Sequence, residues 1–190
     1  MVISHSHFII HKPFGYMRQF VENVKKKKFL GELYPFPEGT MAIGRLDEDS
    51  EGLLLLTTDG KISEQVRSKH IEKEYYAQVD GLITQEAIEN MEKGIEIGNR
   101  SEKYTTLPCK VFKLTEPPNF APRVKKIRDE RHGPTCWISI TITEGKFRQV
   151  RKMTAASGFP TLRLFRVRIG KINLGNLPPG GVIKVDELLF

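Results

Sequence analysis

The pattern of apolar and polar positions along the chain predicts mostly short strands. Apolar runs bounded by turn residues, and strict alternation of apolar with polar positions, are typical of buried and half-buried strands. Such segments occur at residues 8–12, 41–46, 53–57, 74–79, 95–97, 107–114, 138–143 and 162–169. The longest uninterrupted aliphatic run, Leu53–Leu56, predicts a strand that is buried on both faces.

Helical spacing is confined to isolated segments. Asp59 is placed to cap a short helix in which Ile62 and Val66 share a face. Residues 84–93 also have helical spacing, and Gly94 follows where a C-terminal cap is expected. Because strands dominate and no regular strand–helix repeat is present, the sequence predicts the α+β class, with a mixed, mostly antiparallel sheet and flanking helices.

Two connections between these elements are long. Residues 25–39 form a polar stretch with proline and glycine, and residues 116–134 contain several prolines and lack a clear pattern. A loop of the latter length in a compact domain is either functional or mobile. No Ser-rich or Gly-rich linker separates domains, so we expect one globular unit or two small lobes around a cleft.

Composition excludes several classes of protein. The chain has 190 residues, of which 39% are hydrophobic, enough for a sizeable core and too many for intrinsic disorder. It has no apolar run near the roughly 20 residues of a membrane span and no export signal, so we expect a soluble cytoplasmic protein. Cys109 and Cys136 are expected to be free thiols, and neither a zinc motif nor a phosphate-binding glycine motif is present.

The distribution of charge is more informative than its net value of +7. No Asp or Glu occurs between Gly145 and Val185. The basic residues of this stretch are Lys146, Arg148, Arg151, Lys152, Arg163, Arg166, Arg168, Lys171 and Lys184. A charge run is often only a solvated face, but so long a stretch without an acid favours a surface that binds a polyanion.

Residues 44–52, between two predicted strands, are rich in acids. A calcium loop starting at Asp47 would need a glutamate at its twelfth position, where this chain has Thr58, so calcium binding is disfavoured. Two interpretations remain open. The carboxylates form a solvated turn, or one of them, beside Arg45, is a nucleophile in a cleft.

Residues 144–153 lead from a strand into a helix. Phe147, Val150 and Met153 have the spacing of one helical face. Arg148, Arg151 and Lys152 would lie on the other faces. The segment is therefore either a core helix with a polar exterior or a phosphate binder. In the strand 74–79, the adjacent Tyr75 and Tyr76 should point to opposite faces, one of them into the core.

These segments occur in a fixed order that resembles one family. The blocks are Gly44-Arg45-Leu46-Asp47, Lys73-Glu74-Tyr75-Tyr76 and Glu144-Gly145-Lys146 through Arg151-Lys152-Met153. Together with residues 158–164 and the 116–134 loop, they resemble the pseudouridine synthases of the RsuA type, in particular the RluE type. The resemblance runs from His11 to about Gly170. It implies a single catalytic domain over 1–190, in two lobes around a central RNA-binding cleft, without an N-terminal S4 domain.

The resemblance also implies a reaction and a set of site residues. Such enzymes isomerise a uridine of large-subunit ribosomal RNA to pseudouridine, with an aspartate nucleophile and with neither metal nor redox cofactor. The catalytic residues would be Asp47, Tyr76 and Arg151. The substrate-binding residues would be Arg45, Lys146, Arg148, Lys152, Arg163, Arg166 and Arg168. The partner would be large-subunit rRNA, there would be no membrane partner, and the protein would be a monomer.

An alternative function is a non-catalytic rRNA-binding or ribosome-assembly module. Charge and composition fit this alternative equally well. The simultaneous presence of Arg45, Asp47, Tyr76 and Arg151 favours the enzyme.

Overall fold

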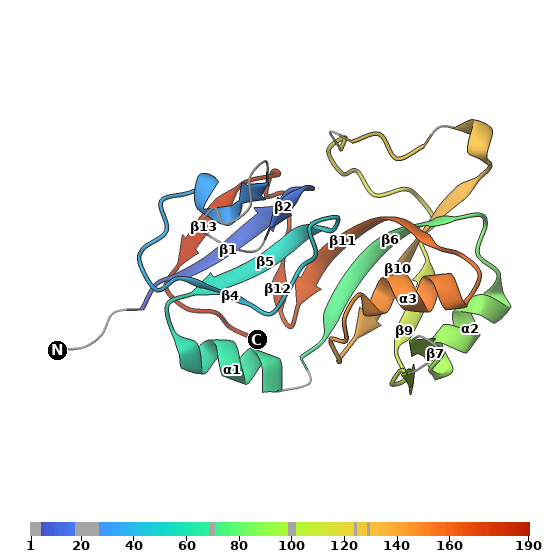
Figure 1. Cartoon of the computed structure of the whole chain (residues 1–190), viewed down its shortest axis with the longest axis horizontal. Helices are drawn as coiled ribbons and strands as arrows, with labels where there is room; N and C mark the ends of the chain where they lie inside the picture. Colours follow the sequence, from blue (N-terminus) through green and yellow to red (C-terminus); the bar gives the residue numbers. More distant parts are fainter. Residues whose placement is uncertain (1–4, 18–26, 69–70, 99–101, 124, 129) are drawn as a thin grey trace. The chain divides into compact units, whose positions relative to one another are not determined.

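The computed structural model describes residues 5–17, 27–68, 71–98, 102–123, 125–128 and 130–190, and the chain divides into two compact units (Figure 1). The first unit comprises residues 1–71 and 165–190, and the second comprises residues 72–164. Each unit has its own buried core, and one strand is divided between the two units.

The first unit is built around two long strands. Its elements are β1 (His7–Lys12), β2 (Tyr16–Met17), β3 (Lys28–Phe29), the 3-10 turn η1 (Leu30–Glu32), β4 (Met41–Ile43), β5 (Glu51–Thr57), α1 (Gly60–Ser68), the second half of β11 (Thr161–Ile169), β12 (Ile172–Asn173) and β13 (Val182–Val185). The strand order is β13-β1-β5-β11, β4 pairs with β5, and β12 pairs with β11. All of these pairs are antiparallel except β5 with β11.

Burial explains why β5 is the central strand of this unit. All seven of its residues are buried, as the run Leu53–Leu56 predicts. The helix α1 packs against β4 and β5. The Asp59 carboxylate accepts the Lys61 N–H at 2.8 Å, and Val66 is buried, so the expected cap and inward face are confirmed.

The second unit has a sheet with a helical cover. Its elements are β6 (Lys73–Asp80), α2 (Gln85–Lys93), β7 (Glu96–Gly98), β8 (Lys103–Thr105), β9 (Lys110–Lys113), the 3-10 turn η2 (Glu130–His132), β10 (Thr135–Ile142), α3 (Gln149–Ala156) and the first half of β11. The order β11-β6-β10-β9 is antiparallel between β6, β10 and β9. The Thr84 hydroxyl caps α2 by accepting the Ala87 N–H.

The two faces of β6 differ in character. Ala77 and Val79 belong to a core cluster that also includes Ile138 of β10, Met91 of α2 and Met153 of α3. Tyr75 packs against this core, whereas alternation directs Tyr76 to the opposite face. The expectation that one of the two tyrosines is core is therefore confirmed.

The predicted fold class is confirmed, since strands dominate and most pairs are antiparallel. Several boundaries differ. The strand expected at 107–114 covers only Lys110–Lys113, and β8 is not predicted by the pattern. The strand expected at 41–46 ends at Ile43, because Gly44 adopts a φ of 75° that ends the extended backbone. The 25–39 connection includes β3 and η1 with a buried Leu30, while Lys25 and Lys26 lie outside the described residues.

The expectation that Phe147 shares a helical face with Val150 and Met153 is wrong. The helix α3 begins at Gln149, and Arg148 before it has a left-handed backbone with φ 52°. This conformation breaks the helical spacing, so Val150 and Met153 are buried while Phe147 is 66% exposed. The 3.6-residue period holds only while the backbone is helical, and here the helix starts after Arg148.

Within the described residues, no helix is long and apolar enough to cross a membrane.

The close approach of β5 and β11 predicts the effect of one substitution. Gly52 has a φ of 102°, and a Cβ added there would lie 2.4 Å from the carbonyl oxygen of Arg166. We therefore expect Gly52→Ala to lower the free energy of unfolding by about 2 kcal/mol or more, as measured by urea denaturation. Gly60→Ala is the control. Nothing lies within 4 Å of that added Cβ, and we expect a change within about 0.5 kcal/mol. Equal losses in both variants would contradict this account.

Candidate active site

The acidic turn between β4 and β5 presents two of the predicted site residues. Leu46 is buried in the first unit and anchors the turn. On either side of it, Arg45 is exposed and Asp47 is half-buried. The Ser50 N–H donates to the Asp47 carbonyl at 3.0 Å, which closes the turn directly after the aspartate. The Asp47 carboxylate is therefore carried by a short, hydrogen-bonded segment.

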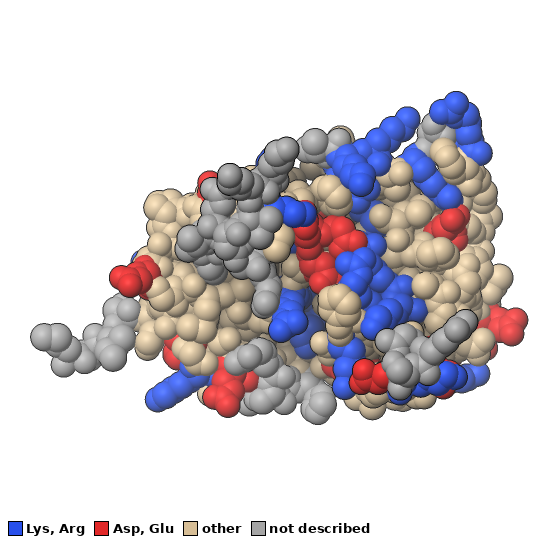
Figure 2. Space-filling view, in the orientation of Figure 1, with Lys and Arg blue, Asp and Glu red and all other residues tan. Residues whose placement is uncertain are grey.

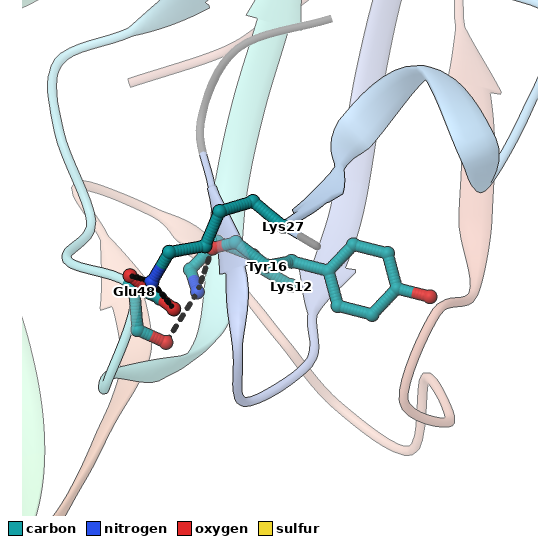
Figure 3. Close-up of polar contacts among 4 residues, drawn as sticks. All are labelled: Lys12, Tyr16, Lys27 and Glu48. Carbon is teal, nitrogen blue, oxygen red and sulfur yellow. Dashed lines mark hydrogen bonds and ion pairs between the residues drawn. The ribbon is translucent and has the colours of Figure 1, made fainter. Parts of the chain in front are cut away.

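Two buried cations bind the backbone of this turn. Arg166 is 3% exposed, and its guanidinium donates to the carbonyls of Leu53 at 2.8 Å and Arg45 at 3.0 Å. The Lys12 side chain has no exposed surface, and its ammonium donates to the carbonyls of Tyr16 at 2.9 Å and Glu48 at 3.4 Å (Figure 3). Carbonyls on both sides of Asp47 are thus held by charged donors, whose hydrogen bonds are stronger than neutral ones.

The environment of Lys12 explains how a buried ammonium is tolerated. Burial lowers the pKa of Lys12 from 10.5 to about 8, while the carboxylates of Glu51 and Asp49, and to a smaller extent that of Asp47, act to raise it. A third carbonyl, that of Pro13, also accepts from the ammonium at 3.1 Å. At neutral pH the lysine therefore stays largely protonated, with all three of its protons donated to backbone oxygens.

Glu48 has a different role from Asp47. Its carboxylate forms an ion pair with the Lys27 ammonium at 2.7 Å, and both side chains are exposed (Figure 3). Only its backbone carbonyl is engaged by Lys12 and by the Gly15 N–H, at 3.4 and 2.9 Å. The Glu48 side chain therefore fits the interpretation of a solvated acid.

Tyr76 lies in the second unit, in an aromatic group on the face of β6 opposite the core. Its ring is 6.2 Å from that of Phe120, which in turn is 5.8 Å from the ring of Trp137 on β10. Burial, and secondarily the nearby carboxylate of Glu74, raises the pKa of Tyr76 above its usual value of 10. The phenol is therefore neutral at physiological pH.

The 116–134 segment is attached to the sheet of the second unit. Besides the Phe120 ring, the Ala121 carbonyl accepts from the Arg163 guanidinium at 2.7 Å, and Arg128 forms an ion pair with Asp80 at the end of β6. Figure 2 shows Lys and Arg side chains projecting from this part of the unit. The segment is thus a basic element that is fastened to the sheet at three points.

The other predicted site residues differ in accessibility. Arg151 of α3 is half-buried and donates to the Thr161 carbonyl at 3.3 Å. Arg168 is half-buried and donates to the Gly170 carbonyl at 2.8 Å. Lys146 is exposed, whereas Arg148 and Lys152 are half-buried.

Arg163 and Arg166, which are expected to bind the substrate, are not on an open surface, and that role stays a prediction. Both are buried, at 7% and 3% exposure, and both guanidiniums donate to backbone carbonyls. Counting charges along a sequence does not separate arginines that bind solvent from arginines that hold backbone.

The predicted catalytic residues are divided between the units. Asp47 and Arg45 belong to the first unit, and Tyr76 and Arg151 belong to the second. Asp47 and Arg151 therefore belong to different units, and their pairing stays a prediction.

Neither cysteine forms a disulfide. Cys136 is buried, and its sulfur accepts the Ile83 N–H at 3.3 Å. Burial, followed by the carboxylates of Glu92 and Glu144, raises the pKa of Cys109 to about 11, so this thiol is not a nucleophile at neutral pH. In the described part of the chain, no group of three or more His, Cys, Asp and Glu is placed to hold a metal ion.

Comparison with known proteins identifies the family. The sequence model of the RNA pseudouridylate synthases matches residues 6–156. The chain belongs to this family. Its members are isomerases, and the matched range includes the acidic turn, Tyr76 and Arg151.

Relatives and solved structures agree with this assignment. The chain is 42% identical over 175 residues to ribosomal large subunit pseudouridine synthase E of Vibrio parahaemolyticus, covering 90% of this chain and 70% of the relative. It is 38% identical over 173 residues to the Xanthomonas axonopodis protein of the same name, covering 90% and 89%. A crystal structure of a pseudouridylate synthase superposes with a TM-score of 0.77 at 25% identity, covering 95% of this chain and 70% of that one. The pseudouridine synthase fold is thereby confirmed.

Sequence reasoning missed two residues that support the site. Lys12 marks the start of the resemblance, but nothing in its neighbourhood signals that its ammonium reaches a turn some 36 positions away. The one feature of the sequence that could have indicated a buried lysine is the position of Lys12 at the end of an apolar strand, directly before Pro13. Phe120 lies in a segment without periodicity, so no pattern links it to Tyr76.

The burial of Lys12 predicts a pH-dependent stability. The pKa of Lys12 is about 8 in the folded chain and 10.5 in the unfolded reference state. Between pH 8 and pH 10.5, Lys12 is therefore protonated in the unfolded chain and largely deprotonated in the folded chain. The free energy of unfolding of the wild type, minus that of Lys12→Met, should therefore rise between pH 8 and 10.5 by up to about 3 kcal/mol. Chemical denaturation across this range measures it.

The exposed Lys61 of α1 offers a matched control. Lys61→Met removes an ammonium that is not buried, so its stability curve should run parallel to that of the wild type. A Lys12→Met curve that is also parallel would contradict the burial argument.

Proposed function

We propose that this chain isomerises uridine to pseudouridine in large-subunit ribosomal RNA, with Asp47 as the nucleophile. The observation that carries the proposal is the 42% identity, over 90% of the chain, to a relative whose name states that activity. The presence of an aspartate between the buried Leu46 and a hydrogen-bonded turn supports the choice of nucleophile.

The reaction requires one bond to break and another to form at the same sugar carbon. The N1–C1′ glycosidic bond of the uridine is cleaved, the base turns, and a C5–C1′ bond replaces it. C5 then loses its proton and N1 gains one, so that the product is an isomer of the substrate. An ionised Asp47 carboxylate attacks the sugar or assists formation of a glycal. Lys12 and Arg166 fix the backbone on both sides of the carboxylate, which limits the reorganisation needed when the substrate binds.

Tyr76 is proposed to stack on the uracil and to carry a proton. Its raised pKa keeps the hydroxyl protonated, so the phenol enters the reaction as a proton donor. Its ring already participates in an aromatic group with Phe120, which supports a stacking role.

The basic residues are proposed to hold the RNA and the displaced strand. Reaching a uridine in a stacked helix costs a few kcal/mol of unstacking, which phosphate contacts and an inserted arginine offset. Arg45 is the exposed arginine beside Asp47 and suits displacement of the base. Lys146, Arg148, Lys152 and Arg168 are proposed phosphate contacts, Arg151 pairs with Asp47, and Arg163 and Arg166 support the site through backbone. A monomeric state and a cytoplasmic location stay predictions.

The nucleophile is tested by Asp47→Asn. The amide has nearly the shape of the carboxylate but cannot attack as an anion, so we expect tritium release from C5-labelled rRNA to fall about 1,000-fold or more. RNA binding should be retained or slightly tighter, because a negative charge is removed. Filter binding and tritium release are measured on the same preparation.

Neighbouring acids of the turn serve as controls for Asp47. Glu48→Gln breaks only an exposed ion pair, and Asp49→Asn nearly keeps the shape of the side chain, so both should retain most activity. Near wild-type tritium release by Asp47→Asn would refute the nucleophile. Absence of release by the wild type from any rRNA, with binding intact, would favour the non-catalytic rRNA-binding module.

The role of Tyr76 is tested by Tyr76→Phe, with Tyr75→Phe as its neighbour on the opposite face. Loss of the hydroxyl should lower kcat about 100-fold or more while leaving RNA affinity within about 2-fold, because the stacking face remains. Tyr75→Phe should change kcat little. A larger loss in Tyr75→Phe would show that the two tyrosines had been assigned the wrong way round.

A further inference from the structure

Phe147 is an exposed aromatic side chain that neither the fold nor the proposed chemistry uses. Its exposed fraction of 66% is the highest among the large exposed apolar side chains of the described residues. A phenylalanine gains about 2 kcal/mol from burial, so most phenylalanines lie inside proteins. Val150 and Met153, which follow it at helical spacing, are buried.

The turn that carries Phe147 is held by buried hydrogen bonds. Gln149 is buried, and its side-chain oxygen accepts the Lys146 N–H at 3.0 Å. Its side-chain amide donates to the buried carboxylate of Glu144, which also accepts the Leu107 N–H at 2.9 Å and the Tyr104 hydroxyl. These bonds fix both ends of residues 144–149, so Phe147 is presented by a defined turn.

The residue after Phe147 has an unfavourable backbone conformation, which separates Phe147 from the helix that follows. Arg148 has φ 52° and ψ 34°, and it is the one non-glycine residue with positive φ in the described parts of the chain. A left-handed conformation costs a non-glycine residue about 1 kcal/mol or more and is found mainly where it serves a function.

One cation lies at the exposed ring, and a second lies at a neighbouring aromatic ring. The Lys152 ammonium lies 5.4 Å from the centroid of the Phe147 ring, and the Lys146 ammonium lies 4.5 Å from that of Tyr104. No acidic residue occurs from Gly145 to the end of the second unit. An exposed ring with an ammonium group beside it matches a nucleotide, whose base stacks on the ring and whose phosphate meets the cation.

We propose that Phe147 is a stacking platform for an unpaired base of the RNA substrate, with Lys146 and Lys152 on the adjacent phosphates. This inference rests on the proposed function, since it takes RNA as the ligand. A single ring on a turn is too small an apolar surface for a stable protein interface, whereas one base against one ring is the usual unit of recognition in single-stranded RNA.

The test compares Phe147→Leu with Phe147→Trp. Overlapping fluorescein-labelled fragments of the large-subunit rRNA are titrated by anisotropy, and the fragment that the wild type binds most tightly is used throughout. Loss of one base stack corresponds to a rise in Kd of about 5- to 100-fold for Phe147→Leu. Phe147→Trp keeps an aromatic face and should remain within about 2-fold of the wild type. With saturating RNA, kcat for tritium release should be unchanged in both variants.

Phe112 of β9 provides a matched control in the same unit. It is 51% exposed, so Phe112→Leu removes a comparable ring without affecting the proposed platform, and its Kd should stay at the wild-type value. Equal Kd values for Phe147→Leu and wild type, equal losses in Phe147→Leu and Phe147→Trp, or equal losses in Phe147→Leu and Phe112→Leu would each overturn the proposal.

The two readouts separate this proposal from the proposed function. Normal tritium release by the wild type with an unchanged Kd in Phe147→Leu overturns the stacking platform and leaves the enzyme in place. No tritium release by the wild type, with a weaker Kd in Phe147→Leu alone, supports the platform and refutes the enzyme.

Discussion

The first unit depends on two cations that are buried in order to bind backbone. Lys12 and Arg166 come from strands far apart in the sequence, and both donate to carbonyls of the turn that carries Asp47. Carbonyl oxygens that were buried without donors would cost free energy, and the cations would cost more without acceptors. The cations and the carbonyls satisfy each other's hydrogen-bonding capacity, so the turn is held to β1 by Lys12 and to β11 by Arg166. The lowered pKa of Lys12 records the cost of this burial.

The second unit separates stability from recognition between the two faces of its sheet. One face of β6 and β10 packs against α2 and α3 in an apolar core. The other face carries Tyr76, Trp137 and the attached Phe120. Alternation in a strand makes this division possible, because neighbouring residues serve different faces without changing the backbone. Tyr75 and Tyr76 show it most directly, since one packs into the core and its neighbour joins the aromatic group.

The turn before α3 also combines residues that stabilise the fold with residues that are exposed to a partner. Gln149 and Glu144 are buried and satisfy each other, whereas Lys146 and Phe147 between them point outward. The left-handed Arg148 separates the exposed part from the helix. A sequence that reads as one amphipathic helix is therefore a rigid turn followed by a helix. The change of backbone conformation, more than composition, decides which apolar residue remains available to a partner.

By itself the sequence determined the long strands β1, β5, β6, β10 and β11, the α+β class, the capped helices α1 and α2 and the blocks that mark the family, because these follow from local spacing and from residue identity. The identity of Asp47, Tyr76 and Arg151 as candidates came from the same source. Only the tertiary structure decided that Lys12 and Arg166 hold the acidic turn, that Arg163 is buried against Ala121, that Phe120 meets Tyr76 and that Phe147 is exposed. These facts depend on contacts between distant residues and on one backbone dihedral angle, and neither leaves a periodic trace in the sequence.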